Sequence, residues 1–196
     1  MIPLFKSQQK TKSLFSTGFT LLETLVAISI LTLSIAGAFS VAQSGLSAAI
    51  IARDQIIAFH LAQEAIELVR HIRDNNTFNG NTDAPQEGWL TDIPSQCFST
   101  DCAVNIVSKK IEECTDGCKI LKNTGSYVQN VSGAAPISNA ISTAFTRKVR
   151  LKNVITNQTN QEVKEVKISV TMSWRKGSLI KTFVTESHIF NWQKRQ

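Results

Sequence analysis

Residues 19–42 form an apolar run of 24 residues that carries one charged side chain, Glu23. As an α-helix, a run of this length spans a bilayer core of roughly 30 Å. A carboxylate within such a segment costs roughly 2.5–3.5 kcal/mol on insertion scales, so it requires a partner. No Lys or Arg lies between Lys12 and Arg53 to provide one. The chain must therefore place this run in an apolar environment and neutralise Glu23 there.

Three interpretations of residues 1–45 compete. A secretory signal peptide would be cut near Ala36-Gly37-Ala38, but the apolar region of such a peptide normally has only about 7–15 residues. An uncleaved signal anchor explains the length and leaves Glu23 without a partner. Cleavage after Gly18, on the cytoplasmic side, would keep the whole run on the mature protein and create an amine on Phe19. We favour this third interpretation, because only it accounts for the glycine, the glutamate and the length together.

Residues 18–23, Gly-Phe-Thr-Leu-Leu-Glu, resemble the class III signal of type IV pilins and type II secretion pseudopilins. The resemblance implies that a membrane prepilin peptidase cuts between Gly18 and Phe19 and that Phe19 becomes N-methylated. It also implies that Glu23 engages the terminal amine of a neighbouring subunit during filament assembly. Opposite charges that pair in a low dielectric offset the cost of burying either one alone. The 18-residue leader and the absence of proline near the end of the run argue against a major pilin.

The charges predict an orientation. The leader contains Lys6, Lys10 and Lys12 and no acid, which predicts a cytoplasmic leader and an exported C-terminal part. The net charge of +6 falls to +3 (6 − 3) without the leader. From residue 144 onward, eleven Lys or Arg and three Glu give +8, whereas residues 19–143 give −5 from seven basic and twelve acidic residues. We interpret this basic lobe as a solvated sheet face; the alternative is a weak attraction for DNA, an anionic polymer or an acidic subunit.

A helical pattern continues beyond the apolar run. Apolar residues at three- and four-residue spacings form one stripe: Ile57, Leu61, Ala65, Leu68 and Ile72. No proline interrupts the helical pattern between Phe19 and Pro85, and asparagines from Asn75 onward end it. We therefore expect one helix from Phe19 to about Asp74, roughly 80 Å long at about 1.5 Å per residue. Its second half requires a sheet to cover the stripe.

From Gln86 the pattern changes to short strands and turns. Residues 145–152 and 166–174 alternate between apolar and polar side chains, as half-buried strands do. Arg175-Lys176-Gly177 predicts a tight turn into a third strand over residues 179–192. We expect an antiparallel meander that covers the helical stripe. This α+β arrangement, one long N-terminal helix packed on a small C-terminal sheet, resembles the plan of type IV pilins.

Three further features resemble minor pilins of the type IV pilus modification protein V type: Phe145-Thr146-Arg147, the strand that ends at Trp174, and the close at Asn191-Trp192. The resemblance to pilins thus covers the N-terminal third and the last fifty or so residues. We divide the chain into a cleaved leader (1–18), a transmembrane or filament-core helix (19–42), its amphipathic extension (43–74), a variable cysteine-containing loop region (75–143) and the sheet of a globular head (144–196).

The four cysteines, Cys97, Cys102, Cys114 and Cys118, lie in the part expected to be exported, where disulfides form. A zinc site is the alternative, although spacers of four, eleven and three residues differ from paired C-x₂-C knuckles. Of the three connectivities, we favour Cys97–Cys102 with Cys114–Cys118. The reason is that residues 115–117, Thr-Asp-Gly, resemble a hairpin loop whose flanking residues face each other.

We expect neither catalysis nor a cofactor. No nucleophile elbow, phosphate loop, zincin helix or paired-carboxylate motif occurs in the sequence. His60, His71 and His188 are not at metal-ligand spacing, so we interpret them as ordinary surface or interface residues and predict no metal site.

The resemblance implies a minor pilin that enters or primes a type IV pilus. Its partners would be prepilin peptidase, other pilin or pseudopilin subunits and the cytoplasmic membrane, which it would cross once with the head outside the cytoplasm. One alternative is a type II secretion pseudopilin. Another is a pilus-tip adhesin or DNA-uptake subunit whose basic lobe contacts nucleic acid.

Overall fold

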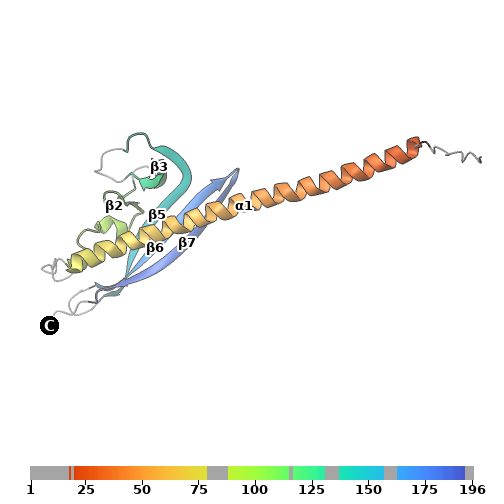
Figure 1. Cartoon of the computed structure of the whole chain (residues 1–196). Coiled ribbons are helices and arrows are strands. Elements are labelled where there is room, and N and C mark those ends of the chain that lie inside the picture. Colours follow the sequence, from red (N-terminus) through yellow and green to blue (C-terminus); the bar gives the residue numbers. More distant parts are fainter. Residues whose placement is uncertain are drawn as a thin grey trace, which may run out of the picture. The chain divides into compact units, whose positions relative to one another are not determined.

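The structure is a computed structural model that describes residues 18, 20–78, 88–114, 117–130, 137–156 and 163–192. It is an α+β chain in which one long helix precedes an antiparallel sheet (Figure 1). The chain divides into two compact units, Met1–Ile50 and Ile51–Gln196. We call the second unit the head. This architecture confirms the predicted type IV pilin-like fold class.

Helix α1 begins at Leu21 and ends at Phe78, about one turn beyond the predicted end at Asp74. The asparagines do not end the helix, because hydrogen bonds formed in the folded chain pair the polar side chains of its last turn. Asn76 is buried, and its Nδ2 donates to the carbonyl oxygen of Trp89 at 3.4 Å. Thr77 is also buried, and its hydroxyl donates to the carbonyl oxygen of Arg73 at 2.8 Å. These bonds give each of the two buried polar side chains a hydrogen-bond partner.

Seven strands form one sheet within the described residues, and all the strand pairs are antiparallel. The short 3₁₀ helices η1 (Gly88–Leu90) and η2 (Ser95–Phe98) precede it. The strands are β1 (Cys102–Asn105), β2 (Lys110–Glu113), β3 (Lys119–Asn123), β4 (Ser126–Gln129), β5 (Ile141–Thr156), β6 (Val163–Lys176) and β7 (Leu179–Phe190).

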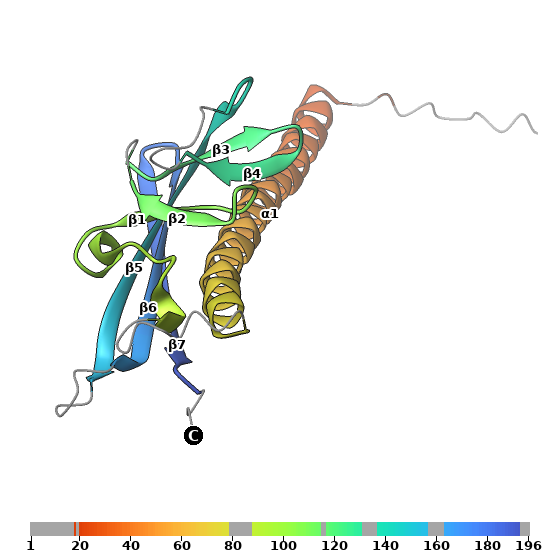
Figure 2. The same ribbon diagram turned by 90° about the vertical axis from the view of Figure 1, so that its left-hand side faces the viewer.

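The long strands β5, β6 and β7 form the predicted meander (Figure 2). β6 pairs with one edge of β5. The other edge of β5 pairs with β1 at Val149 and with β3 between Ile141 and Thr146. The hairpins β1–β2 and β3–β4 therefore extend the sheet on that side.

Residues 75–143, expected to be a variable loop region, contain these two hairpins. Each of their strands has only four or five residues. In β2 and β3 a single side chain is buried, Ile111 and Ile120 respectively. One buried position per strand produces no period-2 pattern, so alternation in the sequence did not reveal them.

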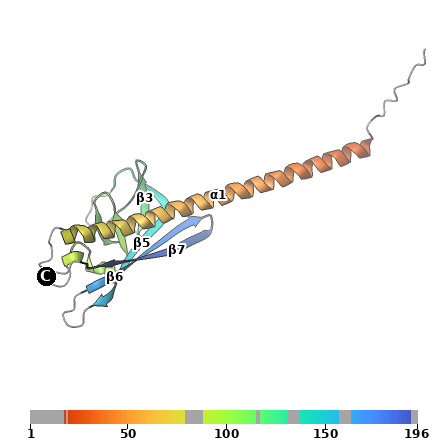
Figure 3. The same ribbon diagram turned by 60° about the horizontal axis from the view of Figure 1, so that its bottom comes forward.

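The inner face of the sheet packs against α1, and this is the core of the head (Figure 3). Of the predicted stripe, Leu61, Ala65, Leu68 and Ile72 are buried and Ile57 is partly buried. The sheet contributes fully buried side chains at alternate positions: Val149, Leu151, Val166, Ile168, Val170 and Met172. Burying each large aliphatic side chain contributes about 1.5–3 kcal/mol. The packing of the sheet over the helical stripe, as predicted, is therefore the main source of stability of the head.

Candidate functional site

The start of α1 is a capped helix terminus. The backbone N–H of Glu23 donates to the hydroxyl oxygen of Thr20 at 3.2 Å, and the N–H of Thr24 donates to the carbonyl oxygen of Thr20 at the same distance. Thr20 is thus the N-cap, and Thr-x-x-Glu is the pattern of a capping box. This local role of Thr20 was not predicted from the sequence, although the three-residue spacing to Glu23 signals it. The negative charge of Glu23 in the first turn also interacts favourably with the positive end of the helix dipole.

The predicted processing residues surround this cap. Gly18 lies two residues before Thr20 and is exposed. Phe19, the predicted mature terminus, lies outside the described residues. Glu23 is exposed, and no ion pair among the described residues involves its carboxylate. Its charge is therefore free to meet a cation from another molecule.

The first unit of the chain exposes apolar side chains on every side of the helix. Every residue from Leu21 to Ile50 is exposed, including Leu21 at 82% and Val41 at 74%. The hydroxyls of Ser29, Thr32 and Ser34 donate to backbone carbonyls of the helix itself at 2.7–2.9 Å. Such internal bonds let polar side chains enter an apolar environment without unmet donors. By length and composition the helix is able to cross a membrane.

A buried arginine organises the head. Arg147 on β5 has 1% of its area exposed. Its Nη1 donates to the carbonyl oxygen of Leu61 and to the carboxylate of Glu64 on α1, both at 2.9 Å. Its Nη2 donates to the carbonyl oxygen of Val104 on β1, and its Nε to Oε1 of Gln129 on β4, both at 2.8 Å. One side chain therefore joins the helix to three strands.

The amide of Gln129 completes this network. It is fully buried, and its Nε2 donates to the carbonyl oxygens of Cys118 and Arg147 at 2.8 and 2.9 Å. Its Oε1 accepts a second bond from the N–H of Val104 at 3.2 Å. All hydrogen-bonding capacity of the amide is used, so the network leaves no unmet group on this side chain.

Burial lowers the pKa of Arg147, and the nearby Glu64 carboxylate acts in the opposite direction. Arginine nevertheless remains charged in proteins. The sequence contained a signal for this residue. Phe145, Arg147 and Val149 have the same parity on β5, so Arg147 occupies an inward position of the alternation. The alternation in residues 145–152 was predicted, but the buried partners that the charge of Arg147 requires were not.

The cysteines form two disulfides, Cys97–Cys102 and Cys114–Cys118, with Cα–Cα distances of 5.4 and 5.1 Å. This is the pairing that the sequence analysis favoured, and it leaves no thiolate for the zinc alternative. Of the predicted hairpin loop, Thr115 and Asp116 lie outside the described residues. Cys118 has a φ of 60°, and its carbonyl oxygen accepts bonds from Gln129 and from the Arg147 N–H. The second disulfide therefore adjoins the buried network.

Several cations of the basic lobe form ion pairs inside the head. Arg147 pairs with Glu64, Lys148 and Arg150 both pair with Asp101, and Lys167 pairs with Glu186. These contacts support the interpretation of the lobe as a sheet face. Among the described residues no group of three or more His, Cys, Asp or Glu side chains is placed to hold a metal ion.

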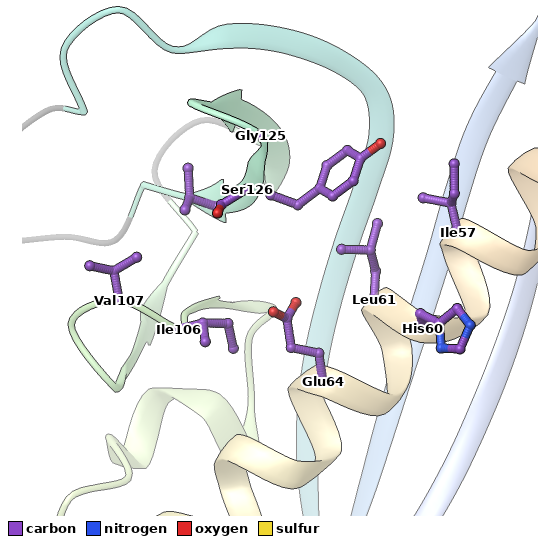
Figure 4. Close-up of a pocket in the computed structure, with 10 residues that line it drawn as sticks. Ile57, His60, Leu61, Glu64, Ile106, Val107, Gly125 and Ser126 are labelled. Carbon is purple, nitrogen blue, oxygen red and sulfur yellow. The ribbon is translucent and has the colours of Figure 1, made fainter.

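A cavity of about 590 Å³ lies between α1, the turn after β1 and the β3–β4 hairpin. Figure 4 shows Glu64 reaching into it from the helix, towards Ile106, beside Leu61. The cavity walls are mostly apolar, and the carboxylate that enters is already paired with Arg147 at 2.9 Å. The cavity therefore has no unmatched charge from Glu64 with which to bind a ligand.

Residues 16–39 match the family model of the prokaryotic N-terminal methylation motif. The match supports the type IV pilin or pseudopilin class. It contains Gly18, Phe19 and Glu23 and the first part of α1, and it ends before the head begins. A motif of this kind indicates a structural subunit that is processed by prepilin peptidase and assembles with other pilins. No curated protein and no solved structure matches the chain.

The Asp101 ion pairs predict a pH dependence of head stability. Partial burial raises the pKa of this carboxyl, but hydrogen bonds and charges of Lys148 and Arg150 outweigh it and hold the pKa below its ordinary value. A depressed folded-state pKa stabilises the head above the unfolded value, and this contribution is lost as pH falls through the folded pKa.

Asp101→Asn should therefore lower the free energy of unfolding at neutral pH by about 1 kcal/mol or less. The difference from wild type should vanish in acid below the folded pKa, and shrink in high salt. Chemical denaturation at a series of pH values measures it. A difference that grew in acid would contradict the sign of the pKa shift.

Proposed function

We propose that the chain is a minor pilin, a structural subunit that enters or primes a type IV pilus. The observation that carries the proposal is the N-terminal methylation motif over residues 16–39, at the start of a helix whose first part, to Ile50, exposes apolar side chains on every side. The carboxylate of Glu23, which has no ion pair among the described residues, supports it, because this charge is stable in an apolar environment only beside a cation.

The proposed sequence of events begins with the leader. Its three lysines keep it in the cytoplasm, so the head lies outside the cytoplasmic membrane. Prepilin peptidase then cuts after Gly18 and the new amine on Phe19 is methylated, which leaves it basic. The carboxylate of Glu23 pairs with the terminal amine of a neighbouring subunit and selects the docking register. The apolar helix then exchanges lipid for the apolar core of a filament, with the head outside.

A type II secretion pseudopilin is the alternative, since the same motif and the same helix would serve it. The identity of the neighbouring genes separates the two systems at little effort. We do not propose a tip subunit that binds nucleic acid, because no observation favours one and ion pairs within the head engage four of the eleven cations of the basic lobe, Arg147, Lys148, Arg150 and Lys167.

The position of the mature N-terminus tests the proposal. Mass spectrometry of the chain purified from its host membrane should find a methylated Phe19 as the first residue. A start near Phe39 would show that a secretory signal peptidase removes the apolar run. A start at Met1 in a host with active prepilin peptidase would equally contradict the proposal.

Gly18→Trp should leave the chain unprocessed. Apart from Gly18 and its two chain neighbours, no atom of the described residues lies within 4 Å of a Cβ built on Gly18, so a larger side chain meets no obstacle there. A loss of cleavage would then report on the fit to the peptidase. Gly37→Ala is the matched control, because that position is equally open and lies in the helix beyond the cut. It should be processed like wild type.

A further inference from the structure

Strand β7 is an open edge of the sheet. Among the described residues it pairs only with β6. The N–H of Asn191 donates to the carbonyl oxygen of Lys164, just beyond the paired stretch on the β6 side. The carbonyl oxygen of Phe190 instead accepts from Arg73 of α1 at 3.1 Å. Backbone groups alternate in direction along an antiparallel ladder, so even-numbered residues of β7 direct their N–H and C=O groups away from β6.

The open part of this edge is its first half. Towards its end, β7 is held by α1, since Arg70 donates to the hydroxyl of Ser187 at 2.8 Å and Arg73 bonds Phe190. From Leu179 to Thr185 the only charged residue is Lys181. Ile180 is 64% exposed and Val184 is 57% exposed. A long edge rich in β-branched and aromatic residues, with few charges, is the type of strand that accepts another strand.

An apolar cavity adjoins the same stretch. It has a volume of about 640 Å³. Five residues at the start of the head helix and one residue of β7 line it: Ala52, Gln55, Ile56, Phe59, His60 and Phe183. The rings of Phe59 and Phe183 lie 6.5 Å apart. A groove between a helix and an edge strand, with a pocket for one side chain, is the arrangement that binds extended peptides by strand addition.

Unpaired cations lie at the hairpin end of the groove. Lys181 is opposite Trp174 and Lys176 is opposite Leu179, which places both on the face of Phe183. Within the described part of the chain neither lysine forms an ion pair. The Nζ of Lys176 is buried and has no hydrogen-bond partner there. A carboxylate from a binding partner would satisfy it.

We propose that the edge of β7 from Ile180 to Glu186 binds an extended segment of another protein, which adds to the sheet as a further strand. The segment has apolar side chains at alternate positions. One of them fills the cavity beside Phe59 and Phe183, and an acidic residue near the hairpin end faces Lys176 and Lys181. This inference rests on the head alone and is independent of N-terminal processing.

The decisive variant is Val184→Pro in the full-length chain, purified in detergent. The N–H of Val184 points away from β6, so proline removes a donor from the open edge and leaves the pairing with β6 intact. Its melting temperature should remain close to that of wild type. Val184→Thr is the matched control, because it keeps the N–H and the β-branched shape.

The probe is a synthetic peptide of alternating Thr and Val with one central Phe and an Asp at one end, labelled for fluorescence anisotropy. Wild type and Val184→Thr should bind it with equal affinity, and Val184→Pro should bind about tenfold more weakly or not at all. Replacing the central Phe by Ala, or Asp by Lys, should also weaken binding. N-methylation of every second backbone nitrogen should abolish binding in one register and have little effect in the other.

Three results would overturn the proposal. The first is absence of binding to folded wild-type protein. The second is binding that Val184→Pro leaves unchanged, which would place the peptide elsewhere. The third is a dimer that Val184→Pro converts to monomer, because the occupant of the edge would then be a second copy of this chain and not a different segment.

Discussion

Arg147→Ala should lower the free energy of unfolding of the head by about 3–5 kcal/mol, the range measured when one partner of a buried ion pair is removed. The side chain is 1% exposed, so its loss leaves a cavity within the core. It also leaves the carbonyl oxygen of Val104 without the Arg147 donor, whereas the carbonyl of Leu61 keeps its intrahelical bond. Each unmet buried group costs about 1–3 kcal/mol. The helix would lose its polar connection to β1 and β4 together.

Chemical denaturation of the full-length chain, followed by tryptophan fluorescence, measures this effect, since Trp89 and Trp174 are buried in the head. Arg150→Ala is the matched control on the same strand. Its side chain is 54% exposed and pairs with Asp101, so it should cost about 1 kcal/mol or less. Arg147→Lys should also destabilise strongly, because one ammonium cannot reproduce the planar fork of the guanidinium. Equal losses for Arg147→Ala and Arg150→Ala would show that the network is not stabilising.

Glu23→Gln should produce a chain that is cleaved normally and is nearly absent from filaments. The substitution removes the charge and keeps the size. It also keeps the capping-box pattern with Thr20, because either Glu or Gln can occupy the third position of the helix in a capping box. A neighbouring subunit would then bury its terminal amine without a counter-ion. A cost of about 3–5 kcal/mol corresponds to a decrease in incorporation of more than about 100-fold.

Immunoblots of sheared filaments and of membranes measure incorporation and processing separately. Thr20→Ala is the control for the local role of this turn. It removes the hydroxyl that caps the helix at a cost of about 1 kcal/mol, while the charge of Glu23 remains. Thr20→Ala should therefore assemble nearly as wild type does. Normal incorporation of Glu23→Gln would refute the pairing role and leave Glu23 only its helix-capping function.

The elements that could be predicted from the sequence are those whose signals are local. The apolar run with Glu23 after a basic leader predicted the motif and the exposed first part of α1. The spacing from Ile57 to Ile72 predicted the buried stripe, and the alternation in residues 145–152 and 166–174 predicted the meander that covers it. These signals are readable because burial on one face of a helix or strand imposes a fixed period on the chain.

Features that depend on contacts between distant residues could not be predicted from the sequence and become visible only in the folded chain. In the sequence, Asn76 predicts the end of the helix, and only the folded chain shows that its side chain bonds to Trp89 within the helix. The strands of the hairpins in residues 102–129 are too short to produce a periodic pattern in the sequence. The inward position of Arg147 is visible in the sequence, but its partners Leu61, Glu64 and Val104 lie 43 to 86 residues away. The open edge of β7 beside Phe59 likewise exists only once α1 lies against the sheet. Hydrogen bonds and cavities depend on which groups are close in space. A local sequence pattern does not show which distant residues the fold brings into contact.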